Sequence, residues 1–249
     1  MRIDFVSDVA CPWCAVGLNA LERALEKIGP DIPVELHFQP FELNPTMAAE
    51  GADAADYLKA KYGMSDAQLA QNRSVIHERG ALVGFTFGDR ARVWNTFDAH
   101  RLLYWAGLLD QRPEPSVQPG EHGGGGAGGS TGGGTGITTG STKGRTTGNK
   151  QRALKHALLK AYHGEGRNPG AHDVLLDLVQ QLGLDSQEAT AVLNEGRYAD
   201  EVRAAEREWS EAGIHSVPAI VINQRHLISG GQPPDVFEQA LRQIAKEAA

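Results

Sequence analysis

Cysteine is the rarest residue type in this chain: its 249 residues contain only two, Cys11 and Cys14. Long apolar runs and basic clusters are missing as well. No apolar run approaches the ~20 residues that a membrane-spanning helix needs, so the sequence predicts no membrane partner. The net charge is −7, and no block of Lys and Arg could neutralise phosphates, so we expect no nucleic-acid partner.

The first residues also lack the features of a targeting segment. Asp4 and Asp8 fall among them, and no long apolar stretch of the kind found in a signal peptide occurs there, so we expect a cytoplasmic location. Disulfides that only brace a fold are uncommon in that compartment, and a bridge over so short a loop would brace almost nothing. Redox or metal chemistry therefore explains the cysteine pair better than a structural bridge.

The two cysteines form a Cys-Pro-Trp-Cys motif between a predicted strand and a predicted helix. Residues 2–6 alternate as a strand does, and a helix follows from Cys11, with Pro12 suited to its first turn and residues 29–30 ending it. Cys14 belongs to the apolar stripe of this helix, whereas Cys11 is expected at its exposed start. A strand–CxxC–helix order is typical of a thioredoxin-type redox site.

The two ends of the chain together predict an α/β fold of the thioredoxin type. Residues 34–38 alternate as a second strand, which completes a βαβ unit. Near the other end, an apolar strand at 219–222, a turn at 223–225, a short strand at about 227–228 and a helix from 233 form a ββα unit. The arrangement βαβ…ββα is that of a thioredoxin-like fold, here split by a large insertion.

We therefore expect a thioredoxin-like domain in two parts, 1–43 and 198–249, around a helical insertion domain at 44–197. Within 110–150 the composition changes, because residues 120–148 contain 14 glycines and nine serines or threonines. Such a segment cannot bury enough apolar surface to offset its ordering entropy, so we predict a disordered loop there. Helical spacing elsewhere predicts helices at 53–62, 66–80, 95–109, 151–162, 171–182, 186–195 and 199–212.

The motif predicts different chemical roles for its two cysteines. Cys11 at the helix start faces unpaired backbone N–H groups, which favour its thiolate, so we predict that it is the nucleophile. Cys14, one turn further, is predicted to resolve the mixed disulfide. Phe5 occupies the position where thioredoxin-like enzymes often bury an acid, and neither Asp4 nor Asp8 clearly replaces it. The proton acceptor of Cys14 is therefore left open.

Two other interpretations of the pair compete with redox exchange. A four-ligand metal site usually shows a second cysteine pair or closely spaced histidines, but the nine histidines are dispersed. His215 is the one that the predicted fold brings toward Cys11 and Cys14, which leaves a closed site incomplete, so we predict no bound metal. The other alternative is a non-enzymatic thioredoxin-fold module whose helical lobe holds a protein partner.

With these elements in place, the sequence resembles the DsbA-like thiol oxidoreductases, specifically the FrnE branch. The resemblance covers everything except about 110–150. It is carried by residues 7–14 (Ser-Asp-Val-Ala-Cys-Pro-Trp-Cys), 40–45 (Pro-Phe-Glu-Leu-Asn-Pro), 95–101 (Asn-Thr-Phe-Asp-Ala-His-Arg), 216–219 (Ser-Val-Pro-Ala) and 229–233 (Ser-Gly-Gly-Gln-Pro).

This resemblance implies that Pro218 is a cis-proline beside the active site and that the helical insertion shapes a substrate groove. Pro12, Trp13, Val217 and Pro218 would contact the substrate, a protein or peptide thiol or disulfide. No bound cofactor is expected. The redox-active Cys11–Cys14 disulfide would be recycled by glutathione or thioredoxin.

The nearest alternative lies in the same superfamily. Kappa-class glutathione transferases and 2-hydroxychromene-2-carboxylate isomerases resemble this fold but carry serine at the position of Cys11. The cysteine pair therefore favours a disulfide oxidoreductase or isomerase over a glutathione-dependent transferase or isomerase. Asn44, Asn95 and His100 lie in the family-like segments, but helix capping and core hydrogen bonds explain them equally well, so we leave them outside the catalytic set.

Overall fold

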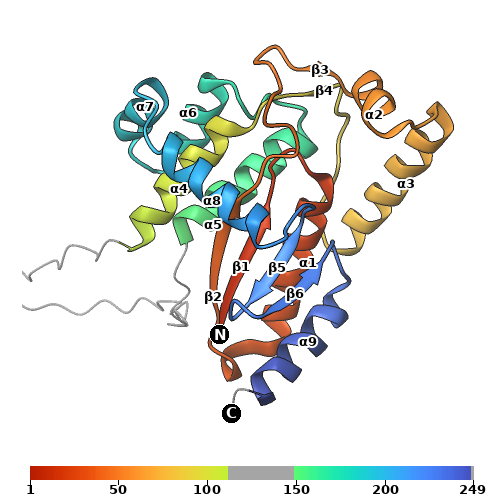
Figure 1. The fold of residues 1–249 in the computed structure, drawn as a ribbon, viewed down its shortest axis with the longest axis vertical. Helices are drawn as coiled ribbons and strands as arrows, with labels where there is room; N and C mark the ends of the chain where they lie inside the picture. The colour runs from red at the N-terminus through yellow and green to blue at the C-terminus, as the bar shows by residue number, and fades with distance from the viewer. Residues whose placement is uncertain (112–148, 248–249) are drawn as a thin grey trace, which may run out of the picture.

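A four-stranded mixed sheet lies at the centre of the computed structural model, which describes residues 1–111 and 149–247. Its strand order is β2-β1-β5-β6 (Figure 1). Strand β1 is parallel to β2 and antiparallel to β5, and β6 is antiparallel to β5. The strands span Arg2–Ser7 (β1), Glu35–Pro40 (β2), Ala219–Ile222 (β5) and His226–Ser229 (β6). The strands predicted at both ends of the chain are therefore confirmed.

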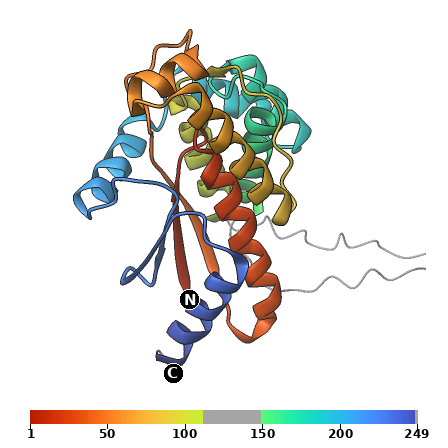
Figure 2. The same cartoon turned by 90° about the vertical axis from the view of Figure 1, so that its right-hand side faces the viewer.

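Two helices, α1 (Pro12–Ile28) and α9 (Pro234–Glu247), cover one face of this sheet (Figure 2). Because side chains alternate along a strand, Ile3 and Phe5 of β1 point into this layer. They pack there against Leu18 and Leu21 of α1 and against Phe237 of α9. Helix α1 begins with Pro12 and ends before Gly29, as the sequence predicts.

The opposite face of the sheet carries α8 (Ala199–Glu211), which Figure 2 shows on the other side from α1 and α9. Val6 points toward this side and packs with Ala219 and Ile214, and the partly buried Trp209 of α8 lies against them. The segment before β5 is thus held between the sheet and α8. At the end of this segment, the carbonyl oxygen of Val217 lies 3.5 Å from the sulfur of Cys11, the residue before α1.

A helical lobe packs on the edge formed by β2 and the start of α1, as Figure 1 shows. Its core surrounds Trp105 and Tyr162, which are both fully buried. Ser65 and Asp185 cap their helices with side-chain hydrogen bonds, as predicted. The lobe contains α4 (Phe97–Gln111), α5 (Asn149–Leu159), a π-helical turn at Lys160–Gly164, α6 (His172–Gln181) and α7 (Ser186–Asn194). The helices α2 (Ala54–Tyr62) and α3 (Asp66–Leu82) lie apart from this lobe in Figure 1, and Ile76 of α3 and Val83 after it pack on the core around α1.

Two details of the insertion differ from the expectation. Strands β3 (Ala52–Asp53) and β4 (Arg92–Val93) pair with each other but are too short to leave a periodic signal. The predicted loop at 110–150 is too wide at both ends, because α4 continues through Gln111 and α5 begins at Asn149. Its centre, 112–148, lies outside the described residues, and the domain boundaries at 44 and 197 stay a prediction.

The end of α4 and the start of α5 are joined by hydrogen bonds. Both carboxylate oxygens of Asp110 accept hydrogen bonds from backbone N–H groups at the start of α5, from Lys150 at 2.9 Å and from Gln151 at 2.9 Å.

In 1–111 and 149–247, the helices are all too short or too polar to cross a membrane.

Candidate active site

The Cys-Pro-Trp-Cys motif lies where β1 ends and α1 begins. Cys11 is the N-cap residue of α1, with an extended backbone, and Pro12 occupies the first helical position. The backbone N–H of Cys14 donates to the carbonyl of Cys11 at 3.0 Å, which folds the motif into the first turn. Both cysteines are free thiols. Proline fits this position because its missing N–H would have no helical partner there.

Both thiols are buried, which corrects the expectation that Cys11 is exposed: Cys11 is 5% and Cys14 0% accessible. The cause is the segment before β5. The carbonyl oxygen of Val217 lies 3.5 Å from the Cys11 sulfur and accepts its hydrogen bond. Cys14 faces the protein interior, as its place in the apolar stripe predicts.

The surroundings move the pKa values of the two thiols in opposite directions. A hydrogen bond from Cys14, helped by the backbone N–H groups of Cys14 and Trp13, lowers the pKa of Cys11 in spite of its burial and the nearby charge of Asp8. Burial, together with the hydrogen bond and charge of Cys11, raises the pKa of Cys14 well above its ordinary value. The thiolate therefore forms first on Cys11, and this asymmetry suits a nucleophile and a protected resolving thiol.

The Val217–Pro218 bond is cis, as the resemblance implies. Pro218 packs directly on α1: a Cβ added to Gly17 would lie 3.0 Å from its Cγ atom. The structure therefore places Val217 and Pro218 against the N-terminal part of α1, the helix that begins with Pro12 and the partly buried Trp13. Of the four predicted substrate-binding residues, Val217 lies against the Cys11 sulfur, Pro218 packs on Gly17, and Pro12 and Trp13 follow Cys11 directly in the chain.

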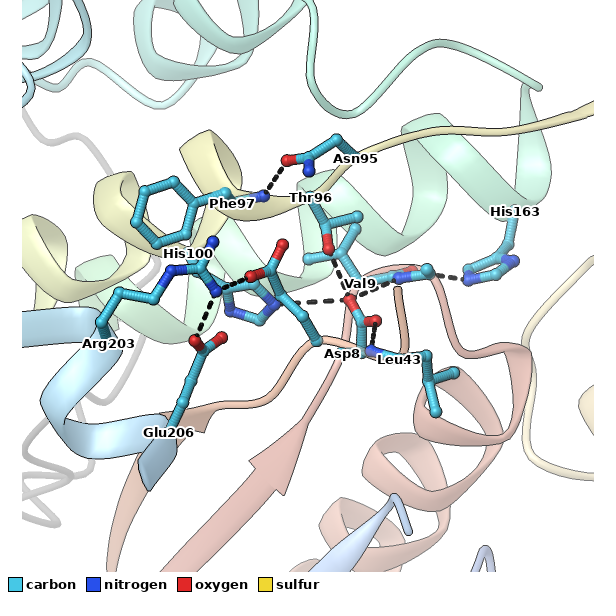
Figure 3. Close-up of polar contacts among 12 residues, drawn as sticks. Asp8, Val9, Leu43, Asn95, Thr96, Phe97, His100, His163, Arg203 and Glu206 are labelled. Carbon is cyan, nitrogen blue, oxygen red and sulfur yellow. Dashed lines mark hydrogen bonds and ion pairs between the residues drawn. The ribbon is translucent and has the colours of Figure 1, made fainter. Parts of the chain in front are cut away.

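Asp8 organises the loop in front of Cys11, and Figure 3 shows the groups that converge on its buried carboxylate. One oxygen accepts hydrogen bonds from the hydroxyl of Thr96 at 2.8 Å and the backbone N–H of Ala10 at 3.0 Å, and lies 3.3 Å from Nε2 of His100. The other accepts from the N–H of Leu43 at 2.7 Å. Burial alone would raise the pKa of Asp8, but the hydrogen bond and charge of His100, together with the N–H groups of Ala10 and Leu43, lower it.

Two further buried titratable groups, His163 and Lys155, come from the helical lobe, and no sequence motif marks either of them. Nε2 of His163 lies 2.8 Å from the carbonyl oxygen of Val9, two residues before Cys11. Lys155 of α5 is 1% accessible, and burial lowers its pKa in spite of the opposing effect of Cys14, Asp8 and Cys11. Both residues come from the π-helical turn or the helix before it, and helical periodicity gives no sign that they approach the cysteines.

A charged cluster on the far side of His100 attaches α8 to the loop after β2. Arg203 of α8 forms ion pairs with the buried Glu42 and with Glu206, and its guanidinium stacks 3.8 Å from the ring centre of Phe97 (Figure 3). Burial, with the charge of Glu206 adding to it, raises the pKa of Glu42 in spite of Arg203 and His100. This cluster positions the loop whose next residue, Leu43, donates to Asp8.

The other polar residues of the family-like segments act on local structure. Asn95 accepts the N–H of Phe97 at 2.8 Å at the start of α4 and donates to the carbonyl of Met47 at 3.0 Å. Asn44 accepts from Lys61 at 2.7 Å. His215 is exposed. Among the residues that the structure describes, no group of three His, Cys, Asp or Glu side chains could hold a metal ion.

The fold and the paired cysteines define a thioredoxin-fold protein with a helical lobe, and comparison with known proteins agrees. The chain matches the DSBA-like thioredoxin domain over residues 2–117 and 141–242, and it belongs to this family of thiol–disulfide oxidoreductases. It is similar to the solved structure of a probable DsbA oxidoreductase from Streptomyces coelicolor. That chain is 31% identical, with a TM-score of 0.78 and coverage of 99% of this chain and 91% of the other.

Two more distant proteins also match over nearly their whole length. The uncharacterized protein YwbO of Bacillus subtilis (strain 168) is 24% identical over 99% of this chain and 98% of its own. The cytosolic disulfide reductase DsbM of Pseudomonas aeruginosa, solved with GSH, is 16% identical, with a TM-score of 0.59 and coverage of 99% and 100%. At this identity the likeness to DsbM shows the shared fold alone. The FrnE branch stays a prediction.

Proposed function

We propose that the protein exchanges disulfides with protein or peptide substrates through Cys11 and Cys14. One observation carries this proposal: Cys11 lies at the start of α1, 3.5 Å from the carbonyl of Val217, with Cys14 buried behind it. The carbonyl and the thiol thus lie at one place, where an extended peptide can pair with the backbone before β5 while its disulfide meets Cys11.

The reaction follows from the opposite pKa shifts of the two thiols. The Cys11 thiolate attacks a substrate disulfide, forms a sulfur–sulfur bond with one substrate sulfur and releases the other as a thiolate. Cys14 then loses its proton and attacks the Cys11 sulfur, which releases the second substrate thiolate and leaves a Cys11–Cys14 disulfide. The substrate gains two electrons and the pair loses two. The reverse sequence oxidises a substrate dithiol.

Reductase or isomerase work in the cytoplasm is part of this proposal, because a reducing glutathione pool keeps such a pair mostly reduced. Glutathione or thioredoxin would return the Cys11–Cys14 disulfide to the dithiol. The name of the distant DsbM, a cytosolic disulfide reductase crystallised with GSH, is in line with this choice. Equilibration of the purified protein with mixtures of reduced and oxidised glutathione measures the potential that decides the direction.

Insulin reduction tests the proposal directly. The wild type should reduce insulin disulfides with dithiothreitol as the final reductant, and both Cys11→Ser and Cys14→Ser should be inactive. Only Cys14→Ser should accumulate a covalent mixed disulfide with substrate, because its nucleophile is intact but its resolving thiol is gone. Accumulation by Cys11→Ser instead would reverse the assignment of the two roles.

The same variants separate an enzyme from a binding module. A module whose helical lobe holds a partner would keep that partner in a pull-down with the double variant Cys11→Ser/Cys14→Ser. Full partner recovery, together with no disulfide exchange by the wild type, would overturn the proposal.

A further inference from the structure

The two backbone carbonyl groups that precede Cys11 are both held by side chains from distant segments. Nε2 of His163 lies 2.8 Å from the carbonyl oxygen of Val9, and the guanidinium of Arg90 donates to the carbonyl oxygen of Ala10 at 3.1 Å. Arg90 comes from the segment between α3 and β4. The oxygen that it binds belongs to the peptide bond that joins Ala10 to Cys11, so a cation stands at the residue before the predicted nucleophile.

The segment that carries Arg90 is fixed on the π-helical turn at two points, one on each side of Arg90. Before it, the backbone N–H of Gly88 donates to the carbonyl of His163 at 2.9 Å, and a Cβ at this glycine would lie 2.1 Å from a carbonyl oxygen of the turn. After it, the carbonyl of Arg92 accepts from the hydroxyl of Tyr162 at 3.0 Å. The guanidinium of Arg90 also lies 5.4 Å from the ring centre of this buried tyrosine. Its position is therefore set before any substrate binds.

The charge of Arg90 is not compensated by an acid. In 1–111 and 149–247, no carboxylate lies within ion-pairing distance of its guanidinium, which contacts the Ala10 carbonyl and the Tyr162 ring. The adjacent Asp89 pairs with Arg73 instead, at 3.6 Å. A guanidinium has five N–H donors, and the carbonyl of Ala10 needs only one of them. Because Arg90 is only partly buried, donors are left for a molecule that binds from outside.

We propose that Arg90 binds a substrate carboxylate next to the disulfide that Cys11 attacks, so that the protein prefers disulfides of acidic peptides. This inference rests on the proposed function and specifies its substrate class. The planar fork of a guanidinium matches the two oxygens of a carboxylate. The chain as a whole has a net charge of −7, so its surface does not attract acidic peptides in general. A local cation beside the thiol is what such a substrate needs.

The other basic groups near the motif are placed differently. Lys155 and His163 are buried, at 1% and 2% accessible, so a substrate side chain does not reach them. Arg79 of α3 donates to the carbonyl of Gly231 at 3.2 Å, and Gly231 packs on Trp13. Arg79 therefore lies on the side of Trp13, whereas Arg90 holds the residue before Cys11.

Two peptide disulfides that differ in one charge test the preference. Both are symmetrical disulfides of short peptides, identical except for Asp or Asn next to the cysteine. Attack by Cys11 is the step whose rate depends on peptide concentration, and acid quenching with mass spectrometry measures it as loss of the free dithiol. Rates are divided by those of dithiothreitol, which corrects for the intrinsic reactivity of each disulfide. The wild type should favour the Asp peptide by about fivefold at low salt.

In Arg90→Gln this ratio should fall to about one, because glutamine keeps an N–H donor for Ala10 but carries no charge. The rate with the Asn peptide should change little. The matched control, Arg92→Gln, makes the same change of charge at an exposed side chain two residues further along and should keep the wild-type ratio.

Three results would contradict the inference. A merely structural role of Arg90 predicts that Arg90→Gln slows both peptides equally, and this would overturn the inference while the exchange activity stands. An equal loss of preference in Arg79→Gln would move the carboxylate to the side of Trp13. If the wild type reacts with neither peptide, the proposed function fails and the inference fails with it.

The wild type alone also decides the question, in case Arg90→Gln does not fold. Raising the salt concentration to ~1 M, where charges are screened beyond about 3 Å, should bring the ratio toward one. Equal rates for the two peptides at low salt would refute the preference. Oxidised glutathione carries carboxylates as well, so it forms a separate arm of the assay with Arg90→Gln. Slowing confined to oxidised glutathione would overturn the assignment to acidic peptides.

Discussion

Acidification should destabilise this protein through one buried imidazole, that of His163. Its side chain is 2% accessible, and its Nε2 lies 2.8 Å from the carbonyl oxygen of Val9. A carbonyl can only accept, so Nε2 carries the hydrogen and the neutral ring donates it. Burial, strengthened by the charge of Arg90, lowers the pKa of His163 from 6.5 to about 3.

The size and sign of the effect follow from this pKa. Below pH ~6.5 the unfolded chain binds a proton on His163 and the folded protein does not, so stability falls as pH falls. One proton corresponds to about 1.4 kcal/mol per pH unit, which gives about 2 kcal/mol between pH 6.5 and pH 5. The lowered pKa of Asp8 acts in the same direction, but only nearer to the ordinary pKa of a carboxyl group. The loss of stability between pH ~6.5 and pH ~5 therefore comes mainly from histidine.

Urea unfolding of the wild type and of His163→Gln measures this contribution. Glutamine keeps an N–H donor for Val9 but does not titrate. Between pH ~7.5 and pH ~5 the wild type should lose about 2 kcal/mol more than the variant. His215→Gln, which removes an exposed histidine, should keep the wild-type slope. Parallel pH profiles for the wild type and His163→Gln would refute a neutral, buried His163.

The strands, helices and cysteine motif were predictable because each leaves a local signal. Alternation marks β1, the three- and four-residue spacing marks α1, and Pro12 and Gly29 mark its ends. The cis bond before Pro218 leaves no such signal and was implied only by the resemblance to the DsbA-like family. The strands, the helices and the motif depend on neighbours in sequence, so composition and periodicity are enough to predict them.

The groups behind the cysteines were not predictable in this way, because they depend on contacts between distant elements. His100 and Thr96 lie about ninety residues from Asp8 in sequence, and Lys155 is further still from Cys14. The π-helical turn also interrupts the α-helical spacing of buried residues on which the sequence prediction relies. It buries three consecutive residues, Ala161, Tyr162 and His163, which an α-helical period would divide between the interior and the surface. The prediction that Cys11 is exposed was wrong for a similar reason. Val217, whose carbonyl lies against the Cys11 sulfur, is distant in sequence, and only the fold brings the two residues together.

The remaining predictions concern two residues of α1, Trp13 next to Cys11 and Gly17 against Pro218. Trp13→His places an imidazole beside this thiol, and a protonated ring stabilises the thiolate. Equilibration with glutathione should therefore show a more oxidising couple, and no shift or the opposite one would contradict the reasoning. Gly17→Ala tests the contact between α1 and the segment before β5, because the added Cβ would lie 3.0 Å from Cγ of Pro218 and 3.3 Å from Cα of Gly231. Overpacking of this kind costs about 1–3 kcal/mol, so the melting temperature should fall. The same clash pushes Pro218 away from α1, so the concentration-dependent attack by Cys11 should slow as well. A stable variant with unchanged attack would mean that the backbone around Pro218 yields freely and does not position the substrate.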